Sequence, residues 1–159
     1  MDHVHRPRIR PAHIAMLRVA IVACLIAFAK LALAQAVPAY RVEGDGISVP
    51  IAEPGDAGRG RALVTARDPA NCILCHGIAA AAVRFAGDLA PPLDGVGARL
   101  SPAQLRLRLV DSSRLNPESI MPAYFRTEGL TQVAPAYRGK TILTGQQVED
   151  LVVYLSTLR

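Results

Sequence analysis

The sequence contains no tryptophan, and only 4% of its 159 residues are aromatic. Aromatic side chains normally supply much of the buried apolar area of a small domain. Apolar residues still make up 51% of the chain and charged residues 19%, which excludes a highly charged, disordered protein. The length suits one ordinary domain. A core with so few aromatic side chains is therefore thin, unless another large apolar group fills it.

Basic charge is also scarce once the first 34 residues are set aside. The whole chain has 18 basic and 13 acidic side chains. Residues 1–34 contain one acidic residue, Asp2, and five of the basic ones, namely Arg6, Arg8, Arg10, Arg18 and Lys30. The remainder thus has 13 basic and 12 acidic groups, a net charge of +1. We therefore expect no nucleic-acid partner and no binding to an anionic membrane surface.

Residues 1–34 have the three parts of a secretory signal peptide. A basic stretch precedes a long apolar run, and the run ends in the small-residue sequence Ala32-Leu33-Ala34. We expect cleavage after Ala34, with cleavage after Ala36 as the alternative. The mature protein is then periplasmic in a Gram-negative host and has no membrane contact after cleavage.

Two membrane-bound alternatives fit the leader less well. Lys30 interrupts the apolar run, whereas a transmembrane anchor needs about 20 apolar residues. The residues after Cys24 stay apolar instead of turning polar, as they would after a lipoprotein cysteine. Translation from Met16 instead of Met1 would give a shorter leader of conventional form, and the sequence alone leaves both starts open.

The remaining chain is expected to comprise an extended arm, residues 35–55, and one domain, residues 56–159. The arm is rich in Pro, Gly and Val and has no helical period, so it either wraps a partner or forms a mobile tail. Capping residues and apolar spacing predict helices over 57–65, over about ten residues from 102, and from 145 to the C-terminus. Long loops separate them, among them 86–97 and 116–126, and such loops need something to pack around.

The chemistry of the chain is concentrated in the sequence Cys72-Ile73-Leu74-Cys75-His76. The spacing C-x-x-C-H is typical of covalent attachment of one c-type haem. Both thiols bond to the porphyrin, and the histidine offers an imidazole nitrogen to the iron. We therefore expect Cys72 and Cys75 as thioether anchors and His76 as the proximal iron ligand.

Three other interpretations of this motif are weaker. A structural disulfide would not require His76. A thioredoxin-type redox pair needs a βαβ context, which the sequence does not show. A zinc site needs about four ligands, and Cys72, Cys75 and His76 are the only Cys and His residues after position 34.

Met121 is the candidate for the second axial ligand of the iron. It is the only methionine after position 34, and it lies in a loop with a proline on each side, Pro117 and Pro122. A thioether is a weak ligand, so a stiff loop suits it. Lys140, a tyrosine or an open site are the alternatives. With His76 and Met121 both bound, the haem would relay single electrons and would not bind oxygen.

A ligating imidazole usually donates its other N–H to a backbone carbonyl. The stiff segment Pro91-Pro92 follows the haem motif closely and is our candidate for this contact. We therefore include Pro92 among the expected cofactor-binding residues. The alternative is that the two prolines only shape a loop.

The order of these features resembles class I cytochromes c, and more narrowly the SoxX family of monohaem cytochromes. The resemblance covers residues 68–159 and includes five segments, ANCILCHG, APPLDGVGAR (90–99), LRLRLVD (105–111), MPAYF (121–125) and LTGQQVEDLVVYL (143–155). Ala70 and Ala90 depart from the family pattern, which has glycine at both positions. The resemblance implies an all-α class I cytochrome c-like fold, with few helices and long loops around one covalently bound haem c.

The resemblance also implies a function and partners. SoxX pairs with the cytochrome SoxA, and the heterodimer acts as an L-cysteine S-thiosulfotransferase that conjugates thiosulfate to a cysteine of SoxY in the SoxY-SoxZ carrier. This chain would be the non-catalytic subunit, without catalytic residues, that passes the released electrons to a downstream cytochrome. The alternative is a free-standing periplasmic electron shuttle. Such shuttles usually dock through a ring of lysines, whereas Lys140 is the only lysine after position 34.

Overall fold

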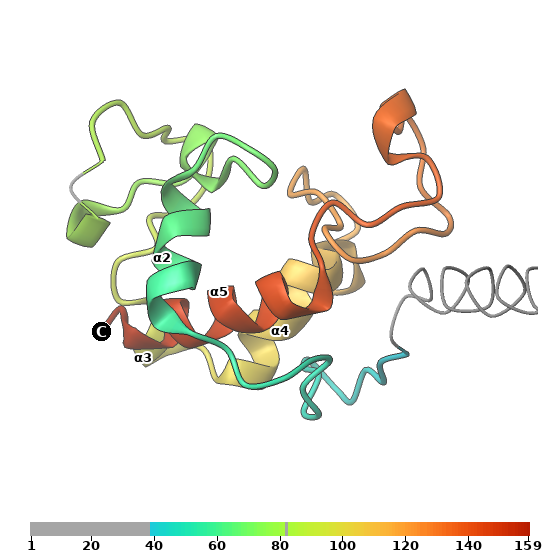
Figure 1. Cartoon of the computed structure of the whole chain (residues 1–159), viewed down its shortest axis with the longest axis horizontal. Coiled ribbons are helices and arrows are strands. Elements are labelled where there is room, and N and C mark those ends of the chain that lie inside the picture. The colour runs from blue at the N-terminus through green and yellow to red at the C-terminus, as the bar shows by residue number, and fades with distance from the viewer. Residues whose placement is uncertain (1–38, 82) are drawn as a thin grey trace, which may run out of the picture. The chain divides into compact units, whose positions relative to one another are not determined.

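The computed structural model describes residues 39–81 and 83–159, and within these ranges the regular structure is helical, with no strand (Figure 1). Two isolated backbone bridges, Glu43–Gly46 and His76–Ala90, are the nearest approach to a sheet in the described part. The expected signal peptide, residues 1–34, lies outside the described residues. So does the start of the expected arm.

Three helices begin where capping residues predict them. Helix α2, Ala57–Thr65, starts after Asp56, whose side chain accepts a hydrogen bond from the Arg59 amide. Helix α4, Pro102–Asp111, and helix α5, Gly145–Thr157, each start with a capping box, formed by Ser101 with Gln104 and by Thr144 with Gln147. In a capping box both side chains satisfy amides that have no partner inside the helix, which fixes the first turn. These three predictions are confirmed.

The expected loop over 86–97 is wrong at its C-terminal end, because helix α3, Val96–Arg99, begins there. Gly95 supplies the positive φ of +70° from which this short helix starts. Gly97 then lies so close to α5 that a Cβ atom would collide with the carbonyl oxygen of Ser156. Gly95 and Gly97 predict a loop from sequence, but in the structure Gly95 provides the left-handed residue before α3 and Gly97 allows α3 to pack closely on α5.

Helix α5 lies at the centre of the fold, because α2, α3 and α4 all pack against it. Gly60 allows the closest contact with α2, since a Cβ atom there would collide with the carbonyl oxygen of Asp150. The buried core is built mainly from these helices and the segments that cross them. It includes Ile47, Val64, Leu107, Val110, Phe125, Leu143, Val148 and Leu151.

The described part of the expected arm is packed against the chain's own helices. Ile47 is fully buried, and its amide donates to the carbonyl of Ala103 at the start of α4. Ile51 is buried as well, and its amide donates to Glu149 Oε1 on α5 at 3.0 Å. Ile47 and Ile51 are thus buried within the chain itself, whereas Val49 between them is 71% exposed.

A buried ion pair joins α4, α5 and this segment. Arg106 Nε and Nη2 donate to the two carboxylate oxygens of Glu149 at 2.7 and 2.9 Å, and Arg106 Nη1 donates to the Ile47 carbonyl at 2.6 Å. Because the carboxylate also accepts from the Ile51 amide, both charged groups are well satisfied by hydrogen bonds inside the protein.

Candidate functional site

The two cysteines of the C-x-x-C-H motif lie on one tight turn. The 3-10 helix η1, Cys72–Leu74, follows Asn71, which has the left-handed conformation that asparagine tolerates well, with φ of 48°. The Cys72 carbonyl accepts from the amides of Cys75 and His76 at 3.2 and 3.0 Å. This turn brings both cysteines and the histidine to the wall of one cavity.

A second segment packs directly on this turn and positions the prolines. The Gly87 amide donates to the Ile73 carbonyl at 2.8 Å, and a side chain at Gly87 would collide with the carbonyl oxygen of Leu74. Three residues later the Ala90 amide donates to the Cys75 carbonyl at 3.0 Å. Residues 87–90 therefore fix the backbone of Pro91 relative to the haem motif.

The carbonyl oxygen of Pro91 lies 2.7 Å from His76 Nδ1. A carbonyl oxygen only accepts hydrogen bonds, so Nδ1 carries the proton and the neutral ring has its lone pair on Nε2. This is the tautomer that binds a metal through Nε2. The sequence predicts that the segment Pro91-Pro92 supplies the carbonyl for His76, and Pro92 is included among the expected cofactor-binding residues. The carbonyl that makes this contact belongs to Pro91. Pro92 lines a second, larger cavity together with His76 and Pro91, and its carbonyl accepts from Arg99 Nη2 at 3.3 Å.

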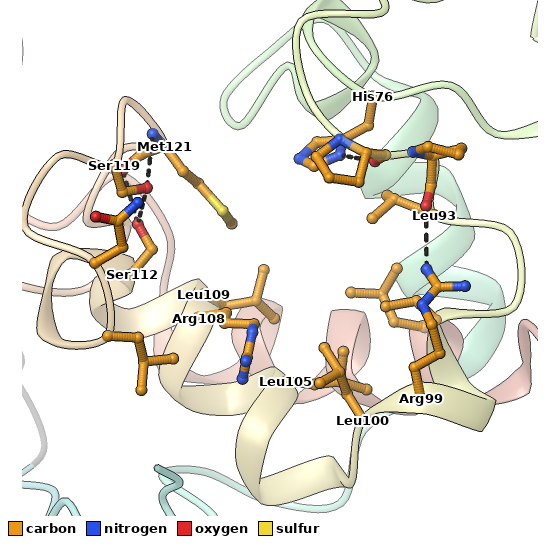
Figure 2. A pocket seen from close by; sticks show the side chains of 16 residues that line it. His76, Leu93, Arg99, Leu100, Leu105, Arg108, Leu109, Ser112, Ser119 and Met121 are labelled. Atoms are coloured by element: carbon orange, nitrogen blue, oxygen red, sulfur yellow. Dashed lines mark hydrogen bonds between the residues drawn. The ribbon is translucent and has the colours of Figure 1, made fainter.

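His76 and Met121 lie on opposite sides of an apolar cavity (Figure 2). The cavity has a volume of about 570 Å³, and its floor includes Leu105 and Leu109 of α4 and Leu155 of α5. A smaller cavity of about 330 Å³ contains the two cysteines in its wall. The two cavities have five lining residues in common, namely His76, Pro91, Asn116, Ser119 and Met121.

These cavities fit a haem attached at the motif. Their volumes are of the size in which proteins hold cofactors, roughly 300–1,000 Å³. The lining combines apolar leucines with one imidazole, one thioether and two thiols, which is the donor set of a c-type haem with His and Met ligands. A large planar apolar group here would also supply the buried area that a core without tryptophan lacks.

The Cys72 thiol is poorly suited to nucleophilic or redox chemistry of its own. Burial raises the pKa of the Cys72 thiol to about 11, so this thiol stays protonated at neutral pH. Reactive cysteines of redox pairs have lowered pKa values instead. Among residues 39–81 and 83–159 no group of three or more His, Cys, Asp and Glu side chains has the geometry of a metal site.

Several contacts that hold the site have no signal in the sequence. The Tyr124 hydroxyl donates to the Ala70 carbonyl at 3.0 Å and so ties the Met121 loop to the residue just before the haem motif. Burial, reinforced by the nearby cysteines, raises the pKa of this hydroxyl, so it remains a donor. Ser112 and Ser119 contact the backbone of Met121. Serines and tyrosines are common on loops, and only the fold shows which of them meet.

A model of the cytochrome c family matches residues 57–159, and the chain belongs to this family. Within the family it is of the SoxX type of monohaem cytochrome. The chain is similar to one in the crystal structure of SoxXA from P. pantotrophus, with 31% sequence identity and a TM-score of 0.70. The match covers 78% of this chain and 98% of that chain. No curated protein sequence matches.

The family and the structural match confirm the class I cytochrome c fold and imply one covalently bound haem c. The chain is thus an electron-transfer domain. None of the described helices is both long and apolar enough to cross a membrane.

Proposed function

We propose that this chain is the electron-relay subunit of a SoxAX-type complex in thiosulfate oxidation. Cys72 and Cys75 hold the haem, and His76 and Met121 bind its iron. The observation that carries the electron relay is the placement of His76 and Met121 on opposite walls of one apolar cavity (Figure 2), and the similarity to SoxXA supports the assignment to a SoxAX-type complex. The bound haem supplies a one-electron couple between ferric and ferrous iron.

The protein's own residues adapt the site to electron relay. The Pro91 carbonyl holds the His76 ring in the tautomer with a free Nε2 lone pair. The leucines of α4 and α5 keep water away from the cavity floor. With both His76 and Met121 as its ligands, the haem iron would have no coordination site open to oxygen or peroxide.

The sulfur reaction is assigned to the partner subunit. In that reaction a carrier cysteine thiol loses its proton, its sulfur forms an S–S bond with the terminal sulfur of thiosulfate, and two electrons are released. The electrons leave through this subunit one at a time. Between residues 35 and 159 the sequence has no cysteine besides Cys72 and Cys75, so no thiol is free to carry a sulfur intermediate.

The surface near the cysteines favours a fixed partner over a shuttle. Leu74, Leu89 and Ile120 are 58%, 70% and 78% exposed, and the last two line the smaller cavity. Among the described residues lining that cavity there is no lysine or arginine, and Glu118 is the one carboxylate. An apolar opening suits a lasting contact with a SoxA-type cytochrome, whereas a diffusing carrier relies on charge for docking. SoxY-SoxZ and a downstream cytochrome complete the proposed set of partners in the periplasm.

The ligand assignment is tested on protein produced in a host that attaches c-type haem. A pyridine haemochrome assay should give one haem per chain. The ferric protein should show the weak absorption band of methionine-to-iron ligation at the red end of its spectrum. Met121→Ala should abolish this band and lower the reduction potential, because a thioether favours ferrous iron. A band unchanged by Met121→Ala would refute the assignment.

The assignment to a complex is tested separately. Co-expression with a SoxA-type cytochrome should give a stable heterodimer, and thiosulfate with the SoxY-SoxZ carrier should then reduce the haem of this chain. A monomer that does not bind SoxA and is reduced directly by a quinol-oxidising complex would favour the alternative function of a free-standing electron shuttle.

A further inference from the structure

The backbone of Met121 is held by two serine hydroxyls (Figure 2). The Met121 amide donates to Ser119 Oγ at 3.3 Å, and Ser112 Oγ donates to the Met121 carbonyl at 3.1 Å. The two hydroxyl oxygens lie 3.0 Å from each other. Both polar backbone groups of one residue are therefore bound by two neighbouring hydroxyls.

The direction of the hydroxyl–hydroxyl bond follows from the number of protons available. A serine hydroxyl has one proton to donate. Ser112 uses its proton on the Met121 carbonyl, so Ser119 must donate to Ser112. The bonds then run in one sense around a closed ring, from the Met121 amide through Ser119 and Ser112 back to the Met121 carbonyl. Hydrogen bonds in such a chain polarise and strengthen one another.

The ring is anchored to the end of α4. Ser112 is 7% exposed and follows directly on that helix, and its own carbonyl accepts from the amides of Leu115 and Asn116, both at 3.1 Å. Farther along the loop, the amide of Tyr124 donates to the Leu109 carbonyl of the same helix. Helix α4 therefore holds the Met121 loop at two points, in addition to the hydrogen bond from Tyr124 to Ala70 beside the haem motif.

We propose that Ser112 and Ser119 are positioning residues that keep the Met121 thioether directed at the haem iron. This inference rests on the proposed ligation by Met121. A thioether binds iron weakly, so its occupancy depends on how seldom the loop opens. Breaking the ring raises the open fraction, and an added ligand then competes more successfully for the iron by the same factor.

The experiment measures imidazole binding to the ferric, haem-loaded protein through the change in the visible absorption of the haem, and the loss of the methionine-to-iron band is a second readout in every variant that keeps Met121. Ser112→Ala and Ser119→Ala should each bind imidazole about fivefold more tightly, which corresponds to one net hydrogen bond. Because both serines belong to one ring, the double variant should show less than the product of the two effects. Ser119→Thr, which keeps the hydroxyl, should remain near wild type.

The decisive control removes the ligand itself. In a Met121→Ala background, Ser112→Ala should no longer change imidazole affinity, because no methionine is left to position. Ser112 also lines the larger cavity, so an equal effect in that background would mean direct contact with the bound ligand and would overturn the proposal. Ser156→Ala, which removes a hydroxyl bonded to the Val152 carbonyl within α5, should leave the affinity unchanged.

Failure of this inference is distinguishable from failure of the proposed function. If the wild-type ferric protein lacks the methionine-to-iron band, the ligation by Met121 is wrong. If the band is present and both serine variants bind imidazole like wild type, or if Ser156→Ala has the same effect as they do, only the positioning role is wrong.

Discussion

The helical frame, which comprises α2, α4 and α5, and the two site loops, residues 66–95 and 112–143, are fixed in different ways. Each frame helix starts at its own cap, and α2 and α4 both pack on α5 through buried apolar side chains and ion pairs. In the described residues of the site loops the helical structure consists of 3-10 turns, and these loops line the cavities together with α3, α4 and α5. Most of the frame is therefore stabilised by contacts among its own helices, whereas the loops are held by a few buried side chains such as Phe125 and Leu143, by individual polar contacts and by the group between them.

The largest expected effect comes from removing the haem, which should change amide protection in the site loops far more than in the helical frame. Replacing both Cys72 and Cys75 by alanine should prevent haem attachment. Amide protection should then be lost in the site loops, since nothing fills the apolar space they enclose, while α5 and its contacts with α2 keep most of theirs. Hydrogen exchange read out by mass spectrometry, together with a haemochrome assay, measures both changes.

Ser156→Ala is the control, because it replaces another small polar side chain by alanine and leaves the motif intact. Equal loss of protection in frame and loops would contradict the comparison and show that the haem organises the whole domain.

The next largest effect is expected from a substitution that destabilises the helical frame and leaves the haem site unchanged. Glu149→Gln leaves the Arg106 guanidinium, 5% exposed, without a carboxylate partner. Removing one member of a buried pair costs about 3–5 kcal/mol. Urea unfolding at pH 7 should show this loss in the free energy of unfolding, while the methionine-to-iron band of the folded protein stays unchanged.

The exposed loop residue Glu128 offers a matched control, since Glu128→Gln removes the same charge without a buried partner. Substituting Arg106 by methionine in the Glu149→Gln background should recover part of the lost stability, because no unpaired buried charge remains. A loss below about 1 kcal/mol for Glu149→Gln would mean that the pair contributes little to the frame.

The difference between the helical frame and the site loops also explains how much of the structure the sequence predicts. Capping boxes act within four residues, so Ser101 with Gln104 and Thr144 with Gln147 predict where α4 and α5 begin. The C-x-x-C-H spacing is local too. In contrast, the Tyr124–Ala70 hydrogen bond and the Ser112–Ser119 ring join residues through the fold, and no local pattern indicates them.

Helix α4 shows why a pattern can mislead. Residues 105–110 alternate like a strand, yet they form a helix whose Leu105, Leu107 and Leu109 are all buried. Leu105 and Leu109 line the larger cavity, while Arg106 between them is buried by its pairing with Glu149. A helix enclosed on several sides has no polar stripe, so the period expected of an amphipathic helix is lost. The burial of Ile47 and Ile51 in the segment before α2 likewise follows from partners far along the chain.

The smallest expected effect concerns the contact between α2 and α5, where the buried carboxylate of Asp150 pairs with the largely exposed side chain of Arg59. Asp150 accepts from Arg59 Nε and Nη2 at 2.8 and 2.7 Å and from the Asp56 amide at 2.8 Å, and the hydrogen bonds from Arg59 are the main cause that lowers the pKa of this carboxyl. A lowered pKa in the folded state means that the unfolded chain binds the proton more readily. The contribution of Asp150 to stability is therefore complete above the ordinary carboxyl pKa of about 4 and is lost as the pH falls through the lowered value.

Asp150→Asn should thus be less stable than wild type at pH 7, and the difference should shrink towards pH 2, as measured by urea unfolding across this range. Asp88→Asn in an exposed loop should show no such convergence, and the effect stays small because the Arg59 side chain is 57% exposed and screened by solvent. A difference that grows on acidification would place the stabilising charge elsewhere in the frame.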